Sequence, residues 1–392
     1  MISKKMKELV ENSSSIRAMF EEGKNLRKKY GIENVYDFSL GNPSVPAPGK
    51  VKEAIVDIVN TKEDIHGYMN NSGYEEVRGR IAESLNKKHD TDFAWKNIIM
   101  TVGAAGGLNV IFKTLLNPGE EVITFAPYFG EYKNYVDNYN GEFIVVSPDT
   151  ATFQPNLMEF QSKITPKTKA VIVNTPNNPT GVVYSERTIM EMASILDEKQ
   201  KEYKTDIYLI SDEPYRELVY DGTFVPYLTK YYKNTIVGYS FSKSLSLPGE
   251  RIGYLVIPDE VKDSEDIIAG ANVATRILGF VNAPSLIQRV VGECIDLEVD
   301  LASYNKNRKL LYHSLTEYGY TCVKPEGAFY LFVKALEEDD KAFASAAKKY
   351  NILIVPGSSF GCPGYCRIAY CVDYSTIVRS LPGFKKLAEE YR

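Results

Sequence analysis

Seven short apolar segments, rich in β-branched and aromatic residues, recur between positions 97 and 257. They are NIIMTV, EEVITFA, GEFIVVS, TKAVIVN, IYLISD, TIVGYSF and RIGYLVI. Helical or loop segments separate them, which is the pattern of an α/β domain with a mainly parallel sheet. Several segments are continuously apolar rather than alternating, as in strands that helices cover on both faces. We therefore predict a mainly parallel seven-stranded sheet sandwiched by helices.

A second group of segments, in the C-terminal part, predicts a smaller α+β domain. A helical stretch near 285–319 precedes the strand-like TCVKPEGAFYLFVKA, NILIVPGSSFG and YCRIAYCV and the helix-like FASAAKKY and GFKKLAEEYR. We expect a large domain over residues 48–285 and a small domain over residues 286–392. Residues 1–47 are expected to form an N-terminal segment that joins the small domain.

Polar and glycine-rich motifs follow five of the seven predicted strands. These motifs are GAAGG, APYF, NTPNNPTG, SDEPY and SFSK. In open α/β sheets, ligands bind at the carboxyl ends of the strands. We therefore predict that these five loops converge on one site.

Lys243 has the most distinctive chemistry in these loops. It lies between TIVGYSF and RIGYLVI, and so at a strand end inside the domain. Lysines in such segments are often solvated charges, and from this residue alone that interpretation stays open. A buried lysine has a lowered pKa, however, and its free amine can act as a general base or form a Schiff base with a carbonyl.

Two other loop features have both a structural and a chemical interpretation. The segment TVGAAGGLNVIFKTLLNPG indicates a strand, a glycine-rich turn at Gly103–Gly107 and a helix, whose free N–H groups suit a phosphate. Glycines also let a helix pack tightly on a sheet, and GAAGGL is not the G-x-G-x-x-G of dinucleotide-binding folds. Asp212, at the end of IYLISD, either caps the next helix or holds a cationic nitrogen.

Composition and charge argue against several classes of function. The 392-residue chain is 44% hydrophobic with a formal net charge of −5, so it can bury a large core but lacks the basic surface of a nucleic-acid-binding protein. With neither a signal-peptide core nor a membrane-length apolar run, we expect a cytoplasmic protein with no membrane partner. Five cysteines fit reduced thiols, and the spacing of Cys362, Cys366 and Cys371 lacks the paired pattern of a zinc site, so no metal is expected.

Ten motifs occur in order along almost the whole chain: GNPSVPAP, GYMNNSGYEEVR, GAAGGL, APYFGEY, NTPNNPTG, SDEPYREL, SFSKSLSLPGERIGY, NAP, EGAFYLF and CRIAYCV. In this order and spacing they resemble the fold-type I, pyridoxal-phosphate-dependent aminotransferases of class I/II, which include aspartate aminotransferase. The resemblance implies pyridoxal 5′-phosphate as cofactor and transfer of an amino group from an L-amino acid to a 2-oxo acid such as 2-oxoglutarate. A lyase or decarboxylase on the same scaffold, or a cofactor-binding regulatory domain, is the alternative.

The resemblance assigns roles around the cofactor ring. Lys243 is expected to hold the cofactor as a Schiff base and then to move the substrate proton. Asp212 is expected to pair with the pyridine nitrogen, and Tyr215 and Asn178 to hydrogen-bond the phenolic oxygen. Phe129 is expected to stack on the ring, although it can also be a core aromatic, with Tyr128 or Tyr132 as the nearer neighbour.

The resemblance also implies a phosphate site and a substrate site. The phosphate is expected to contact Gly103, Ala104, Ala105, Ser240 and Arg251, with Tyr68 contributed by the partner subunit of a homodimer. The substrate is expected to contact Gly41, Asn178 and Arg367. Arg367 would bind the α-carboxylate as a bidentate fork, or else form a strand-edge ion pair.

Two finer expectations concern the peptide bonds near the site and the substrate. We expect cis peptide bonds before Pro127 and Pro179, which would turn Phe129 and Asn178 toward the cofactor. We also expect a dicarboxylic donor such as aspartate, with Arg276 near its distal carboxylate. The spacing from Arg276 to Asn282 is one residue longer than the resemblance implies, so a solvated arginine at a helix end is the alternative.

Overall fold

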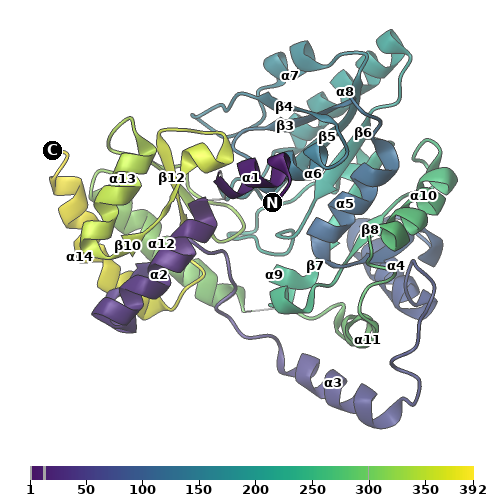
Figure 1. The fold of residues 1–392 in the computed structure, drawn as a ribbon, viewed down its shortest axis with the longest axis horizontal. Coiled ribbons are helices and arrows are strands. Elements are labelled where there is room, and N and C mark those ends of the chain that lie inside the picture. The colour runs from purple at the N-terminus through teal and green to yellow at the C-terminus, as the bar shows by residue number, and fades with distance from the viewer. Residues whose placement is uncertain (1, 12–14, 299) are drawn as a thin grey trace.

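The computed structural model describes residues 2–11, 15–298 and 300–392, and its centre is a seven-stranded sheet (Figure 1). The strands are β2 (Ile98–Thr101), β3 (Glu121–Phe125), β4 (Glu142–Val146), β5 (Thr168–Asn174), β6 (Tyr208–Asp212), β7 (Thr235–Ser240) and β8 (Gly253–Val256). Their order is β2-β8-β7-β6-β5-β3-β4. Only the pairings of β8 with β2 and β7 are antiparallel, so the mainly parallel sheet predicted from the sequence is confirmed.

Helices cover both faces of this sheet because successive side chains of a buried strand point to opposite sides. On one face, α5 (Gly103–Leu115), α6 (Glu131–Asp137) and α10 (Ser264–Ile277) pack against residues such as Ile99 and Leu255. The other face is covered in two halves. Helices α7 (Leu157–Lys163) and α8 (Glu186–Tyr203) cover one half, and α3 (Gly49–Thr61), α4 (Glu75–His89) and α11 (Ser285–Cys294) cover the other.

A second core lies beside the large sheet and combines the two ends of the chain (Figure 1). It contains the antiparallel sheet β11-β12-β9, formed by Val355–Pro356, Tyr365–Ala369 and Tyr330–Lys334. It also contains the short parallel pair of β1 (Tyr36–Asp37) and β10 (Ile352–Leu353). The remaining helices are α1 (Lys4–Glu11), α2 (Ser15–Tyr30), α9 (Phe241–Ser244), α12 (Leu301–Glu317), α13 (Asp340–Ala347) and α14 (Tyr374–Glu389).

Contacts near the expected domain boundaries show with which of the two cores each boundary segment packs. The division into domains itself stays a prediction. Met19, Val35 and Phe38 belong to the same core cluster as residues of α12 and α14. In contrast, α11 packs against α3 and α4, so residues 285–294 lie with the large sheet. Within the described residues, no helix has the length and apolarity needed to cross a bilayer.

The glycine-rich segment differs from the predicted turn because the helix begins at its first residue. Gly103 is the first residue of α5 and has φ +69°, a conformation that favours glycine, and Gly107 lies within the helix. A Cβ at Gly107 would lie 3.3 Å from the Leu255 side chain on β8. These glycines therefore bring α5 close to the sheet as well as forming its N-terminus.

The prediction of two cis peptide bonds is half right. Ala126–Pro127 is cis, as expected, but the second cis bond is Thr175–Pro176, and the bond before Pro179 is not cis. NTPNNPTG contains two X-Pro bonds three residues apart, and either bond can adopt the cis form. The local sequence does not distinguish them; the surrounding fold does.

Candidate active site

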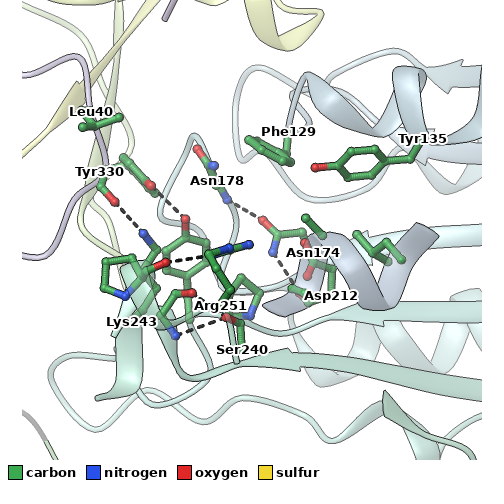
Figure 2. A pocket seen from close by; sticks show the side chains of 18 of the residues that line it. Leu40, Phe129, Tyr135, Asn174, Asn178, Asp212, Ser240, Lys243, Arg251 and Tyr330 are labelled. Atoms are coloured by element: carbon green, nitrogen blue, oxygen red, sulfur yellow. Dashed lines mark hydrogen bonds between the residues drawn. The ribbon is translucent and has the colours of Figure 1, made fainter. Parts of the chain in front are cut away.

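A pocket of about 260 Å³ lies where the carboxyl ends of the parallel strands meet the second core (Figure 2). Most of the sequence-predicted site residues line it: Gly41, Ala104, Ala105, Phe129, Asn178, Asp212, Tyr215, Ser240, Lys243, Arg251 and Arg367. Gly103 is not among the lining residues, although a Cβ there would lie 2.8 Å from Arg251 Nη2. Tyr68 and Arg276 are exposed and do not line the pocket either. The convergence of the five loops is therefore as predicted.

Lys243 extends into this pocket from the short helix α9, directly after β7. Its Nζ donates a hydrogen bond to the Gly41 carbonyl at 2.6 Å and lies 5.4 Å from the Phe329 ring centroid. Burial lowers the pKa of Lys243 to about 8, and the charges of Arg367 and Arg251 act in the same direction. A substantial fraction of the side chain is therefore an uncharged, nucleophilic amine near pH 8.

Asp212 is the last residue of β6, and its carboxylate is almost fully buried. Oδ2 accepts a hydrogen bond from Tyr132 Oη at 2.5 Å, but Oδ1 is buried without a partner. Burial raises the pKa of Asp212 to about 7. A buried acceptor without a donor lowers the stability of the folded protein. A cationic or N–H group bound in the pocket would therefore be a favourable partner for this oxygen.

Asn174 connects the loops that carry Asp212 and Asn178. Its Nδ2 donates to the Asp212 carbonyl at 2.9 Å, and its Oδ1 accepts from the Asn178 backbone N–H at 2.7 Å (Figure 2). Asn174 is the last residue of β5 and pairs in register with Asp212 on β6. The two strand ends are therefore fixed relative to each other by one side chain.

Hydroxyl groups, helix N–H groups and an arginine gather at one end of the pocket. The Oγ atoms of Ser240 and Ser242 lie 2.6 Å apart, close to the first turn of α5 at Ala104 and Ala105. Arg251 Nη1 donates to the Pro248 carbonyl at 3.0 Å. The first N–H groups of a helix have no partners within it, so this end of the pocket suits an anion.

Arg367 also lines the pocket; it lies on β12 and is almost fully buried. Nη1 donates to Asn178 Oδ1 at 3.0 Å and Nη2 to the Ser39 carbonyl at 2.6 Å, while Nε is buried without a partner. Within the described residues no carboxylate forms an ion pair with this guanidinium. A strand-edge ion pair is therefore ruled out there, and a carboxylate ligand remains the fitting partner.

The aromatic residues near the pocket have distinct positions. Phe129 lines the pocket, whereas Tyr128 packs against Phe143 and Tyr132 binds Asp212. Of these three aromatics, Phe129 is the one that lines the pocket. Its stacking role stays a prediction.

Several lining residues were not identified from the sequence. They are Leu40, Leu108, Tyr135, Asn174, Pro214, Ser242, Pro248 and Tyr330. Asn174 and Ser242 lie inside quoted motifs, so the position of each at a strand end was an available signal. Tyr330 lies within the apolar strand EGAFYLF, where no local feature separates it from a core aromatic.

The class I and II aminotransferase family model matches residues 33–380. The chain belongs to this family. Membership confirms the enzyme class predicted from the sequence: the protein is an aminotransferase, and it transfers amino groups. The regulatory-domain alternative is therefore not supported.

Individual relatives agree over nearly the whole chain. The aminotransferase is 32% identical to the "Probable aspartate/prephenate aminotransferase" of Aquifex aeolicus, over 94% of both chains. It is 30% identical to aromatic-amino-acid aminotransferase 2 of Thermococcus litoralis, over 97% of this chain and 96% of the relative. The crystal structure of an amino transferase from Eubacterium rectale is 48% identical, with a TM-score of 0.97 over 100% of this chain and 99% of the other.

The lowered pKa of Lys243 predicts unusual reactivity in the cofactor-free aminotransferase. Modification of Lys243 by a small amine reagent should rise with pH about a midpoint near 8, compared with about 10.4 for an ordinary lysine. Mass-spectrometric quantification of the Lys243 peptide across a pH series measures this midpoint. The exposed Lys167 provides the internal reference for reagent decay, and a midpoint of 10 or above for Lys243 would contradict the prediction.

Proposed function

We propose that this aminotransferase binds pyridoxal 5′-phosphate in the pocket and holds it covalently through Lys243. The observation that carries the proposal is the buried, unpartnered Oδ1 of Asp212 in the same cavity as a lysine of lowered pKa. A protonated pyridine nitrogen is the partner that this oxygen lacks. When bound, the cofactor supplies an electron sink that stabilises negative charge at the substrate Cα.

The residues of the chain divide the remaining tasks by their chemistry. Asp212 keeps the pyridine nitrogen protonated, and Tyr215 and Asn178 hydrogen-bond the phenolic oxygen. Ser240, Arg251 and the first N–H groups of α5 bind the phosphate. Phe129 covers the ring face. The presence of these side chains in the lining of one pocket supports the assignments.

Arg367 binds the α-carboxylate of the substrate, and Lys243 moves the proton. Two observations support the first role: the guanidinium is buried, and its Nε has no partner. Gly41 adds a backbone contact at the mouth of the site. As a free amine, Lys243 Nζ would be the base that moves the proton at the substrate Cα, a task that suits an amine with a pKa of about 8.

The preferred amino donor is proposed to be a dicarboxylic amino acid such as aspartate, with 2-oxoglutarate as acceptor. The name of the Aquifex aeolicus relative supports aspartate, and that of the Thermococcus litoralis relative supports an aromatic donor as the competitor. Arg276 is the proposed contact for the distal carboxylate. It is exposed in the last turn of α10, and so available to a neighbouring subunit.

Borohydride reduction tests the covalent assignment. Reduction of the aminotransferase reconstituted with pyridoxal 5′-phosphate should fix the cofactor on the peptide that contains Lys243, because among the described residues Lys243 is the only lysine that lines the pocket. Peptide mapping by mass spectrometry reads the result. Lys243→Arg keeps the charge and serves as the control that should trap no cofactor. Label on another lysine, or no label, would refute the proposed function.

A homodimer with shared sites is proposed because Tyr68 is 92% exposed in the single chain and so is free to reach a neighbour's phosphate. Light scattering of the reconstituted enzyme should give twice the mass of one chain. Tyr68→Phe should weaken cofactor binding about tenfold or more, the usual cost of a lost hydrogen bond to a charged group. Tyr30→Phe, at another exposed tyrosine, is the control. A fully active monomer would contradict the shared site.

The assignment of Arg276 predicts a selective loss of activity. Arg276→Ala should lower kcat/KM for aspartate about thirtyfold, and far less for alanine or phenylalanine, since removing such an ion pair costs about 2 kcal/mol. Arg187→Ala, at a surface arginine on α8, is the control. Equal losses for all three donors would reject Arg276 as the distal-carboxylate contact.

A further inference from the structure

Tyr330 on β9 is a pocket residue to which the proposed function gives no role. Its side chain is almost fully buried, and its hydroxyl lies 2.8 Å from the hydroxyl of Tyr215. The two rings meet edge to face, with centroids 5.6 Å apart. Tyr330 therefore contacts the residue that the proposed function places on the phenolic oxygen of the cofactor.

Tyr330 also contacts the proposed carboxylate site. The Arg367 guanidinium lies over the Tyr330 ring, 4.7 Å from its centroid. The hydroxyl is also closely covered by the N-terminal segment, because a Cβ at Gly41 would lie 2.1 Å from Tyr330 Oη. The Tyr330 side chain thus contacts both Arg367 and Tyr215.

Either hydroxyl of this pair could be the donor, and the contacts of Tyr330 favour one direction. A guanidinium over the ring withdraws electron density from Tyr330 and makes its O–H the stronger donor. Burial raises the pKa of both phenols. The charge of Arg367 opposes this rise for both phenols. Because the guanidinium lies over the Tyr330 ring, the Tyr330 hydroxyl is assigned as the donor, which leaves the proton of Tyr215 available to the pocket.

We propose that Tyr330 is a positioning residue, an inference that rests on the proposed function. Tyr330 donates a hydrogen bond to Tyr215, directs the Tyr215 proton toward the cofactor and links Tyr215 to Arg367. A hydroxyl that accepts a hydrogen bond becomes a better donor itself. With the cofactor bound, Tyr215 would stabilise negative charge on the phenolic oxygen. This would lower the pKa of the nitrogen that joins Lys243 to the cofactor. The other ionisable groups around the pair are Tyr132, Asp212, Lys243, Arg367 and Cys371.

Absorbance titration of the reconstituted enzyme tests this link without relying on activity. Tyr330→Phe keeps the ring under Arg367 and removes the donor, so the pKa read from the visible cofactor band should rise by about 0.5 unit, the scale of one net hydrogen bond. Tyr215→Phe should raise it further. In the Tyr215→Phe background, Tyr330→Phe should have no additional effect, because its action passes through Tyr215.

Controls separate the inference from the proposed function and from a purely structural role. Tyr320→Phe removes a buried hydroxyl that binds the Phe384 carbonyl, away from the pocket, and should titrate as wild type. If wild type shows no titrating cofactor band, the proposed function fails. If wild type titrates and Tyr330→Phe matches it, or if the shifts of Tyr330→Phe and Tyr215→Phe add, the inference is overturned.

The ring of Tyr330 is tested separately. Tyr330→Leu also removes the surface on which the Arg367 guanidinium rests, so KM for the amino donor should rise about tenfold more than in Tyr330→Phe. Steady-state kinetics at saturating 2-oxo acid measure the two values. Equal KM values for the two variants would show that the Tyr330 ring does not help to position Arg367.

Discussion

The site depends on the register of two parallel strands. Asn174 and Asp212 end β5 and β6 side by side, and the Asn174 side chain binds both the Asp212 carbonyl and the Asn178 N–H. That single amide fixes the acid of one loop relative to the asparagine of the next. Asn178 in turn accepts from Arg367, so the large sheet and the second core are joined through the same chain of hydrogen bonds.

The buried charges of the pocket work against folding over different pH ranges. The pKa of Asp212 is raised to about 7, so the folded chain binds more protons than the unfolded chain between about pH 4 and 7. Its contribution to stability therefore falls as pH rises through that window. The pKa of Lys243 is lowered to about 8, so its contribution rises with pH between about 8 and 10. Between these windows both groups carry charges that the pocket disfavours, which is the condition under which a ligand of complementary charge stabilises most.

Much of this architecture could be predicted from the sequence because strand ends and apolar runs are local signals. All seven strands of the large sheet lie within the predicted segments, and TKAVIVN matches β5 residue for residue. The features that the sequence did not predict correctly depend on long-range packing. Nothing local to NTPNNPTG places the cis bond before Pro176 rather than Pro179. Tyr330 resembles a core aromatic until β9 is packed against Tyr215 and Arg367. Tyr68 is 92% exposed in the single chain, so its proposed role depends on a second subunit rather than on the fold of one chain.

The pairing of β1 with β10 limits the order in which parts of the protein can fold during synthesis. Tyr36 pairs with Ile352, 316 positions later in the chain (352 − 36 = 316). Gly41, which follows β1, receives the Lys243 hydrogen bond. During synthesis from the N-terminus, the residues around Gly41 leave the ribosome long before the strand that holds them exists. The large sheet can form first. The segment around Gly41 can take its place over Lys243 only after β10 has emerged, when nearly the whole chain has been made. A product truncated before β10 would therefore contain Lys243 but lack the strand that positions Gly41 beside it.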